Sequence, residues 1–432
     1  MNKILSPGKR LKQVRKELGL KQSDITGGQI TRNLISIIEN DKASLTKNVA
    51  EIICNSINQI CINRNINFRI SAEDLTESTI EQSNTIVKMY LSKLDLITST
   101  KSSDFTIIID EIESFLIDIE NNELKVQLLE KISQLYKVDF DYNNTYKYLL
   151  RAYESNDRTF NDTKHFDLLL NLSACSSMLG RYKEGLNFNR LAMIYTDHMS
   201  LELKYKFMYN MAIDYFDLKD YDHSISQINL IMSSLYVTDK QSYNLQILKS
   251  NNLKKQKNYN QSIEILNDLV RSEKEYNSLL LPYLNLLDIY LLLKDHDKVK
   301  LHIDKCLTIS NKLSDSDDIK RKSSIYLNVG KGFELLGDLH QAISYFKLAL
   351  DIAEEYSYYE KVHSSIDALF RLTQETKGDM NEFKNLLIEL ISKGSIKPNT
   401  KTLFKTIQHF NGIGDVQSVK SLLELCIEYT DI

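Results

Sequence analysis

The sequence predicts an all-α protein, and three observations support this prediction. Only 3 prolines and 13 glycines occur in 432 residues, too few for a sheet protein with frequent turns. Hydrophobic residues make up 42% of the chain and charged residues 26%, which is ordinary for a globular protein. Short polar breaks recur at nearly constant intervals between amphipathic segments, which indicates a repeated helical unit.

Each break ends at a residue that we call the anchor, which is apolar, aromatic or histidine. The residue just before the anchor is polar, in most breaks an aspartate. Successive anchors are separated by 40, 39, 38, 37, 43, 41 and 36 residues. A period of this length predicts two helices per repeat. The anchors are Tyr142, Tyr182, Tyr221, Tyr259, His296, Leu339, Met380 and Val416.

The N-terminal 70 residues have a different pattern and predict a small domain of five helices. Apolar residues recur in helical register from Gly8 to Leu18, and Gly19 ends that helix. A short second helix is expected from Gln22 to about Thr26, followed by a turn at Gly27 and Gly28. The remaining predicted helices lie at Thr31 to Asn40, at Thr46 to Asn58, and next to the latter.

The charge distribution separates this head from the rest of the chain. Residues 1–70 contain 12 Lys/Arg and 5 Asp/Glu, a net charge of +7, whereas the whole chain has −4 and the remainder therefore −11. A basic head on an acidic body favours nucleic-acid binding at the N-terminus.

The head resembles the helix-turn-helix domain of phage-repressor-type regulators. The resemblance rests on Arg15, on Gly19-Leu20 with Gln22, and on the run Ile35-Ser36 with Ile38-Glu39. The turn is one residue shorter than in generic repressors, which is similar to PlcR-like peptide-responsive factors. The family resemblance implies that Arg15 and Glu39 form a structural ion pair. Asn40-Asp41 replaces the usual basic residue and glycine after the recognition helix.

Candidate DNA-binding residues follow from this arrangement. Gln22 is expected at a helix N-terminus, where a phosphate is favoured. The start of the third helix should enter the major groove, where Arg32 can read guanine and Asn33 adenine. The full DNA-binding set comprises Gln22, Thr31, Arg32, Asn33 and Ser36, with Arg10, Lys12 and Lys47 on the DNA backbone.

The repeated body resembles the tetratricopeptide repeat, a helix-turn-helix unit. The best-matching unit runs from Tyr326 to Tyr356, with Gly330 on its first helix and Phe346 on its second. Small residues are needed where the helices cross closely, and a large ring fills the remaining space. The resemblance implies a right-handed superhelix with a concave inner face.

Asparagines recur 11 residues before the anchors in four of the eight repeats, at Asn171, Asn210, Asn285 and Asn328. Asn251 lies on the same expected face in the fourth repeat, where Leu248 interrupts the series. An amide can bond both the N–H and the C=O of an extended peptide. The series, which we call the asparagine ladder, therefore predicts a peptide-binding face, although the chain is rich in asparagine throughout.

Nothing in the sequence indicates an enzyme, a cofactor or a metal site. The eight histidines form no HExxH motif or Cys/His cluster, and no phosphate-binding glycine loop occurs. The five cysteines contain no CxxC pair, which favours buried thiols in a reducing compartment. No signal peptide or membrane-spanning stretch is visible, so a cytoplasmic location is expected.

The predicted domains are a DNA-binding head at 1–70, a linker helix at 71–104 and a repeat domain for peptide binding and dimerisation at 105–432. This combination resembles the RRNPP family, which implies a cytoplasmic homodimer that binds an inverted repeat in duplex DNA and a short signalling peptide. The terminal repeats, with Leu422, Leu423 and Cys426, are the expected dimer surface. Two alternatives are a scaffold acting on a response regulator or other protein, and a repressor whose repeats only dimerise.

Overall fold

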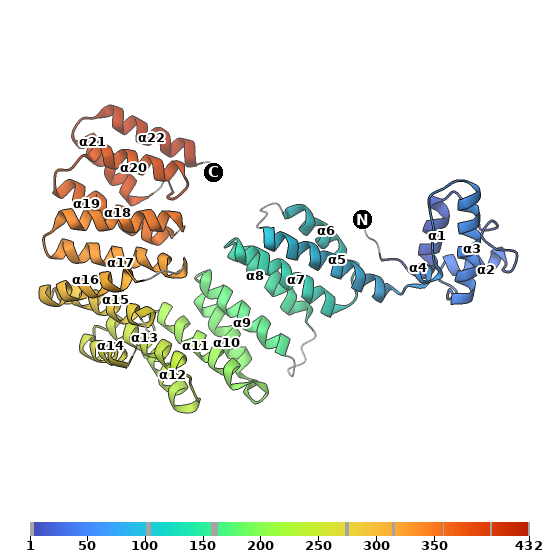
Figure 1. Ribbon diagram of the computed structural model, residues 1–432, viewed down its shortest axis with the longest axis horizontal. Coiled ribbons are helices and arrows are strands. Elements are labelled where there is room, and N and C mark those ends of the chain that lie inside the picture. Colours follow the sequence, from blue (N-terminus) through green and yellow to red (C-terminus); the bar gives the residue numbers. More distant parts are fainter. Residues whose placement is uncertain are drawn as a thin grey trace. The chain divides into compact units, whose positions relative to one another are not determined.

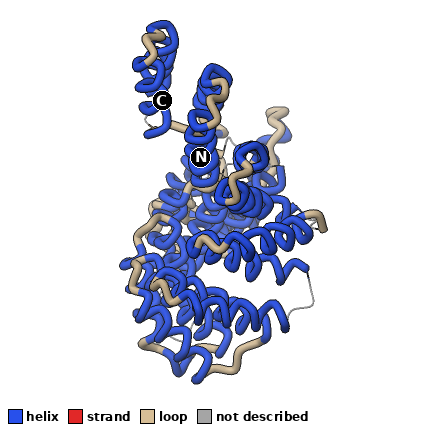
Figure 2. The backbone as a smooth tube through the Cα atoms, turned by 90° about the vertical axis from the view of Figure 1, so that its left-hand side faces the viewer, coloured by secondary structure: helices blue, strands red, loops and turns tan. Residues whose placement is uncertain are grey.

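The computed structural model describes residues 4–100, 105–156, 163–272, 276–312, 316–356, 358–397 and 400–430. Within these ranges all regular structure is helical, with 22 α-helices and one 3-10 turn (Figures 1 and 2). No helix among the described residues is long and apolar enough to cross a membrane. The chain forms two compact units, Met1–Leu218 and Lys219–Ile432.

The head at the start of the first unit contains α1 (Pro7–Glu17), α2 (Arg32–Glu39), α3 (Lys47–Asn63) and α4 (Ala72–Thr76). Ser6 caps α1 and Thr31 caps α2, because each hydroxyl accepts a hydrogen bond from a backbone N–H three residues later. The fully buried side chains Leu11, Ile25, Ile35, Ile53 and Ile57 form the centre of its core.

The helix expected from Gln22 to Thr26 is absent, and turns occupy this segment. The Asp24 carboxylate accepts the Lys21 N–H at 2.8 Å, and the Asp24 N–H donates to the Lys21 carbonyl. Side chains that bond the local backbone compete with helix formation. Gly27 and Gly28 then take φ values of +57° and +70°, so the predicted turn is present.

The remainder of the first unit is a series of packed helices. Tyr90 lies in the segment expected to be a linker helix, and its ring centroid is 5.5 Å from that of Phe115. Both rings belong to one hydrophobic core, so this helix packs with the helices that follow it. The helices are α5 (Thr79–Thr100), α6 (Thr106–Leu116), α7 (Asn122–Val138), α8 (Tyr142–Ser155), α9 (Thr163–Met178), α10 (Tyr182–Met193), η1 (Thr196–His198) and α11 (Leu201–Asp217).

The second unit continues with stacked helices, as Figure 1 shows from α13 to α22. The first helices of successive repeats contact one another, so α13, α15, α17, α19 and α21 form one layer. The helices are α12 (Tyr221–Ser234), α13 (Asp239–Lys255), α14 (Tyr259–Ser272), α15 (Tyr276–Leu293), α16 (His296–Ser310), α17 (Ser316–Leu335), α18 (Leu339–Glu355), α19 (Tyr359–Glu375), α20 (Met380–Ser392), α21 (Lys401–Gly412) and α22 (Val416–Thr430).

The regular breaks have a common backbone structure. All eight anchors are the first residue of the second helix of a pair. In the first pair Phe140 has φ +58°, and the Asp141 N–H bonds the Tyr136 carbonyl while its carboxylate caps α8. A left-handed residue that ends one helix is thus followed directly by the cap of the next. In the seventh repeat Lys377 is the left-handed residue, one position earlier than in the others.

The packing expected for the tetratricopeptide unit is present in α17 and α18. A Cβ added to Gly330 would lie 2.9 Å from ring carbons of Phe346, which is fully buried. Ala349 is also fully buried one turn further along α18. Glycine therefore allows the ring to pack directly on the backbone of α17.

Candidate functional site

A hydrogen-bonded cluster connects the elements of the head. Arg15 binds Glu39 through two parallel contacts, Nε to Oε1 at 2.5 Å and Nη2 to Oε2 at 2.9 Å. Arg15 Nη1 also donates to the Leu20 carbonyl at 2.8 Å. The ion pair that the resemblance implied is therefore present. It joins α1 to α2 in a nearly buried position, because the Glu39 side chain is 1% exposed.

The ionised state of Glu39 depends on these donors. Burial by itself raises the pKa of Glu39, but the hydrogen bonds from Arg15 and Gln22 outweigh it and hold the pKa below its ordinary value. The pKa of Arg15 is raised, chiefly by its hydrogen bond to Glu39. Both groups are therefore charged at neutral pH.

Two predicted DNA contacts are engaged within the head. The Gln22 amide donates to Glu39 at 2.8 Å, and the helix N-terminus on which its phosphate contact depended is absent. Arg10 lies 3.2 Å from Glu77 and also donates to the Asp74 carbonyl, with 16% of its side chain exposed. In the structure both side chains bind other groups of the head, and their contacts with DNA stay predictions.

The residues at the start of α2 are largely exposed. Thr31, Arg32 and Asn33 are exposed, and Ser36 is half-buried one turn later. The Thr31 hydroxyl accepts the Leu34 N–H at 3.2 Å, which fixes the first turn. Among the described residues no hydrogen bond or ion pair engages the Arg32 guanidinium or the Asn33 amide, so both remain available to a ligand.

The two lysines predicted on the DNA backbone differ in their surroundings. Lys12 is half-buried on α1. Lys47, at the start of α3, lies 3.0 Å from Glu73, and its hydrogen bond to Glu73 raises its pKa. Because both side chains of this pair are about two-thirds exposed (65% and 69%), water and phosphate can compete for the lysine.

Asp41 lies in the loop after α2. Its φ is +55°, and its N–H and that of Lys42 bond the carbonyls of Ile38 and Ile37. Its carboxylate accepts the Ser6 hydroxyl at 2.6 Å, which ties the start of α1 to the end of α2. Aspartate tolerates the left-handed region better than most residues, so the loop after α2 takes this conformation without glycine.

The asparagine ladder lies on the first helix of each pair. Asn171 is exposed, and the others are half-buried. The neighbouring Leu172, Leu286 and Val329 are fully buried, as expected, whereas Met211 is only half-buried. The ladder residues are Asn171 on α9, Asn210 on α11, Asn251 on α13, Asn285 on α15 and Asn328 on α17.

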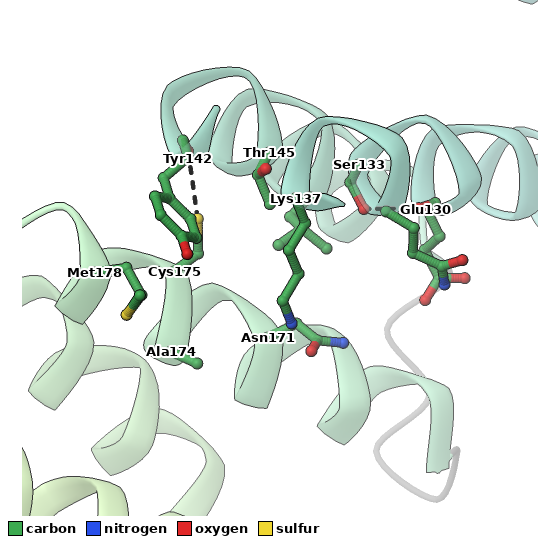
Figure 3. Close-up of a pocket in the computed structure, with 11 residues that line it drawn as sticks. Glu130, Ser133, Lys137, Tyr142, Thr145, Asn171, Ala174, Cys175 and Met178 are labelled. Carbon is green, nitrogen blue, oxygen red and sulfur yellow. Dashed lines mark hydrogen bonds between the residues drawn. The ribbon is translucent and has the colours of Figure 1, made fainter. Parts of the chain in front are cut away.

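Asn171 borders a hollow of about 380 Å³ formed by α7, α8 and α9. Its wall includes the apolar side chains of Leu149 and Met178, and Cys175, whose thiol donates to the Tyr142 carbonyl. Lys137 reaches from α7 toward Asn171, as Figure 3 shows. The hollow thus combines an apolar wall with an amide and a cation.

A second hollow, of about 530 Å³, lies between α15 and α17 in the second unit. We call it the α15–α17 hollow. It lies beside two ladder positions, since Asn285 and Asn328 are each one helical turn from a lining residue. Its lining consists of Asp288, Leu291, Leu292, Lys331, Glu334 and Leu335.

Sequence reasoning missed the charged residues beside the ladder. Lys254 Nζ lies 3.4 Å from Asn285 Oδ1 and 2.6 Å from Asp288 Oδ2. Lys331 Nζ lies 3.4 Å from Asn328 Oδ1. These lysines do not share one position relative to the anchors, so no sequence signal marked them.

No group of three or more metal-binding side chains occurs among the described residues. All five cysteines are free thiols, and burial raises the pKa of Cys54 and of Cys306 to about 12. Thiols of this kind are unreactive at neutral pH and serve as packing groups.

Comparison with known proteins identifies the repeated body. Residues 107–362 match the family model described as SusR N-terminal TPR domain. This match spans more than half of the chain, so the protein belongs to that tetratricopeptide-repeat family.

Several solved structures are similar at low sequence identity. Apo NprR, a quorum sensor from B. thuringiensis, has a TM-score of 0.47 and 14% identity, covering 81% of this chain and 99% of that chain. Apo RapI has a TM-score of 0.45 and 16% identity, covering 80% of this chain and 98% of that chain. Bacillus thuringiensis PlcR, in complex with the peptide PapR7 and DNA, has a TM-score of 0.29 and 14% identity, covering 69% of this chain and 98% of that chain. The comparison with curated proteins finds no match.

Proposed function

We propose that this protein is a cytoplasmic, peptide-responsive transcription regulator and not an enzyme. Its head binds duplex DNA, and the asparagine ladder binds a short extended peptide. The observation that carries the proposal is the exposed first turn of α2, where Arg32 and Asn33 are unengaged within a segment, residues 1–70, of net charge +7. The same chain contains a tetratricopeptide array with asparagines in register.

The Arg15–Glu39 pair supports the DNA-binding half. It fixes α2 against α1 from the buried side, so that the opposite side of α2 faces solvent in one orientation. A rigid helix with free guanidinium and amide groups at its start is suited to bidentate contacts with base edges.

DNA binding can be tested without a known operator by selecting duplexes from a random pool of about 40 base pairs, several times the half-site spacing of one helical turn. We expect enrichment of an inverted repeat and an affinity that falls steeply with salt. Arg32→Ala should weaken binding to the selected duplex roughly 5- to 150-fold, equivalent to about 1–3 kcal/mol. Arg64→Ala, an exposed arginine after α3, is the matched control and should change affinity much less. Failure to select any duplex would overturn this half of the proposal.

Dimerisation is proposed through the last repeat. Leu422 is fully buried in its own unit and is unavailable, which corrects one expected contact. Val416, Leu423 and Ile427 are 76%, 46% and 73% exposed, and their spacing places them on one stripe of α22. Light scattering should give twice the 50.1 kDa chain mass, and Leu423→Glu should reduce it to that of the monomer.

Peptide binding can be tested with a pool of random seven-residue peptides passed over immobilised protein and read by mass spectrometry. We expect a defined subset to be retained, and Asn285→Ala or Asn328→Ala to reduce retention roughly 5- to 150-fold for an unpaired polar group. If duplexes are selected but no peptide is retained, the protein is instead a repressor whose repeats dimerise. If peptides or proteins bind without DNA, the scaffold alternative is favoured.

A further inference from the structure

Lysines beside the ladder determine which way its amides face. An ammonium group has only hydrogen-bond donors, so the amide atom next to Lys254 or Lys331 must be the oxygen. The NH₂ groups of Asn285 and Asn328 are then the ends left for a ligand. Groups that bind there must be acceptors, such as the carbonyl or carboxylate oxygens of a peptide.

The charges around the α15–α17 hollow are unequally matched. Asp288 is bound by Lys254 at 2.6 Å, and Glu334 is bound by Arg371 on α19. Lys331 has no carboxylate within ion-pair distance among the residues that the structure describes. Because Lys331 is exposed and lines the hollow, its ammonium group can form an ion pair with an anion that enters there.

We propose that the α15–α17 hollow binds a carboxylate of the peptide ligand through Lys331, while the NH₂ groups of Asn285 and Asn328 donate to backbone carbonyls on either side. The inference rests on the proposed peptide-binding function and adds the chemical class of the ligand group. Its site is built from neighbouring helices of one unit and does not depend on the placement of the two units.

The dimensions fit an extended peptide. Adjacent packed helices lie about 8–10 Å apart, and an extended chain rises about 3.3 Å per residue. About three peptide residues therefore span the distance from Asn285 to Asn328. The apolar part of the lining, Leu291, Leu292 and Leu335, faces the same space and suits an apolar side chain beside the carboxylate.

The carboxylate has two possible sources, the C-terminus of the peptide or an Asp or Glu side chain. Four pools of random seven-residue peptides separate them. The first pool has free C-termini, the second has amidated C-termini, and two further pools repeat these forms without Asp or Glu. All four are passed over the full-length protein, and retained peptides are quantified by mass spectrometry.

The variants test the two parts of the site separately. Lys331→Met removes the cation and should reduce retention roughly 10- to 100-fold, whereas Lys300→Met, on an exposed part of α16, removes the same charge elsewhere and should not. Asn285→Asp keeps an oxygen for Lys254 but removes both donors. It should reduce retention at least as much as Asn285→Ala, and circular dichroism of each variant verifies folding.

The outcomes are distinguishable. The site is supported if the amidated pool without Asp or Glu is not retained and if Lys331→Met reduces the retention of the other pools. The two pools that keep only one kind of carboxylate then identify its source. Retention that is indifferent to peptide charge and to Lys331, or that survives Asn285→Asp, overturns the inference while peptide binding stands. If wild-type protein retains no peptide from any pool, the peptide-binding function itself fails and the inference fails with it.

Discussion

Asp214 is a buried carboxylate without a cationic partner among the described residues, and replacing it by asparagine should make the first unit more stable at neutral pH. It is fully buried on α11, where Asn189 donates to it at 3.1 Å and Ser177 donates to its other oxygen. Burial raises its pKa to about 6 despite these two hydrogen bonds, and Asp217 adds to the increase. The ionised form is therefore disfavoured in the folded chain.

The magnitude follows from the difference between this pKa and the ordinary value of 3.8. At about 1.36 kcal/mol for each pH unit, ionising Asp214 costs the folded state about 3 kcal/mol. Because the folded pKa is raised, the stabilising contribution of the protonated form is complete below about pH 4 and is lost as the pH rises through about 6. The amide introduced by Asp214→Asn would imitate the protonated form. The Asn189 amide oxygen has no hydrogen-bond partner among the described residues, so this amide can turn and accept the new NH₂ group.

The assay is urea unfolding of wild type and Asp214→Asn, followed by far-ultraviolet circular dichroism at about pH 7.5 and about pH 5.0, on either side of the folded pKa. The stability difference in favour of the variant should shrink by about 1.4 kcal/mol or more between these two pH values. Subtracting the two proteins cancels the titration of all other groups. Parallel pH profiles would refute the reasoning, because they would mean that Asp214 does not change its protonation on folding.

Three further substitutions test the packing of the head and of the repeats. In Gly8→Ala the new Cβ would lie 2.0 Å from the Ile38 carbonyl oxygen, so α1 and α2 must separate at a cost of about 3 kcal/mol, measurable as faster hydrogen exchange in the head. Arg15→Ala leaves Glu39 buried without its cation and should destabilise the head by about 3–5 kcal/mol, with loss of DNA binding in the duplex selection. Phe346→Ala opens a cavity against α17 and should cost about 3–5 kcal/mol, seen as a lower urea midpoint.

The repeat architecture could be predicted because its signals are local. In most repeats a left-handed residue stands two positions before the anchor and an aspartate directly before it, and each acts on its own stretch of backbone. The eight anchors therefore marked the starts of the second helices correctly, and the SusR-type repeat match covers most of this region. The exposed start of α2 was predictable for the same reason, since Thr31 caps the helix whose first turn carries Arg32.

The sequence by itself determined the helical class, the repeat boundaries and which asparagines share a register, because all three depend on neighbouring residues. Tertiary structure decided which side chains remain free. Arg10 binds Glu77, 67 positions later, and Lys254 reaches Asn285 from the preceding repeat. Gln22, which was expected to begin a helix, donates a hydrogen bond to Glu39. Such contacts form only when separate helices pack, since the attraction between two charges depends on their distance in space and not on their separation along the chain.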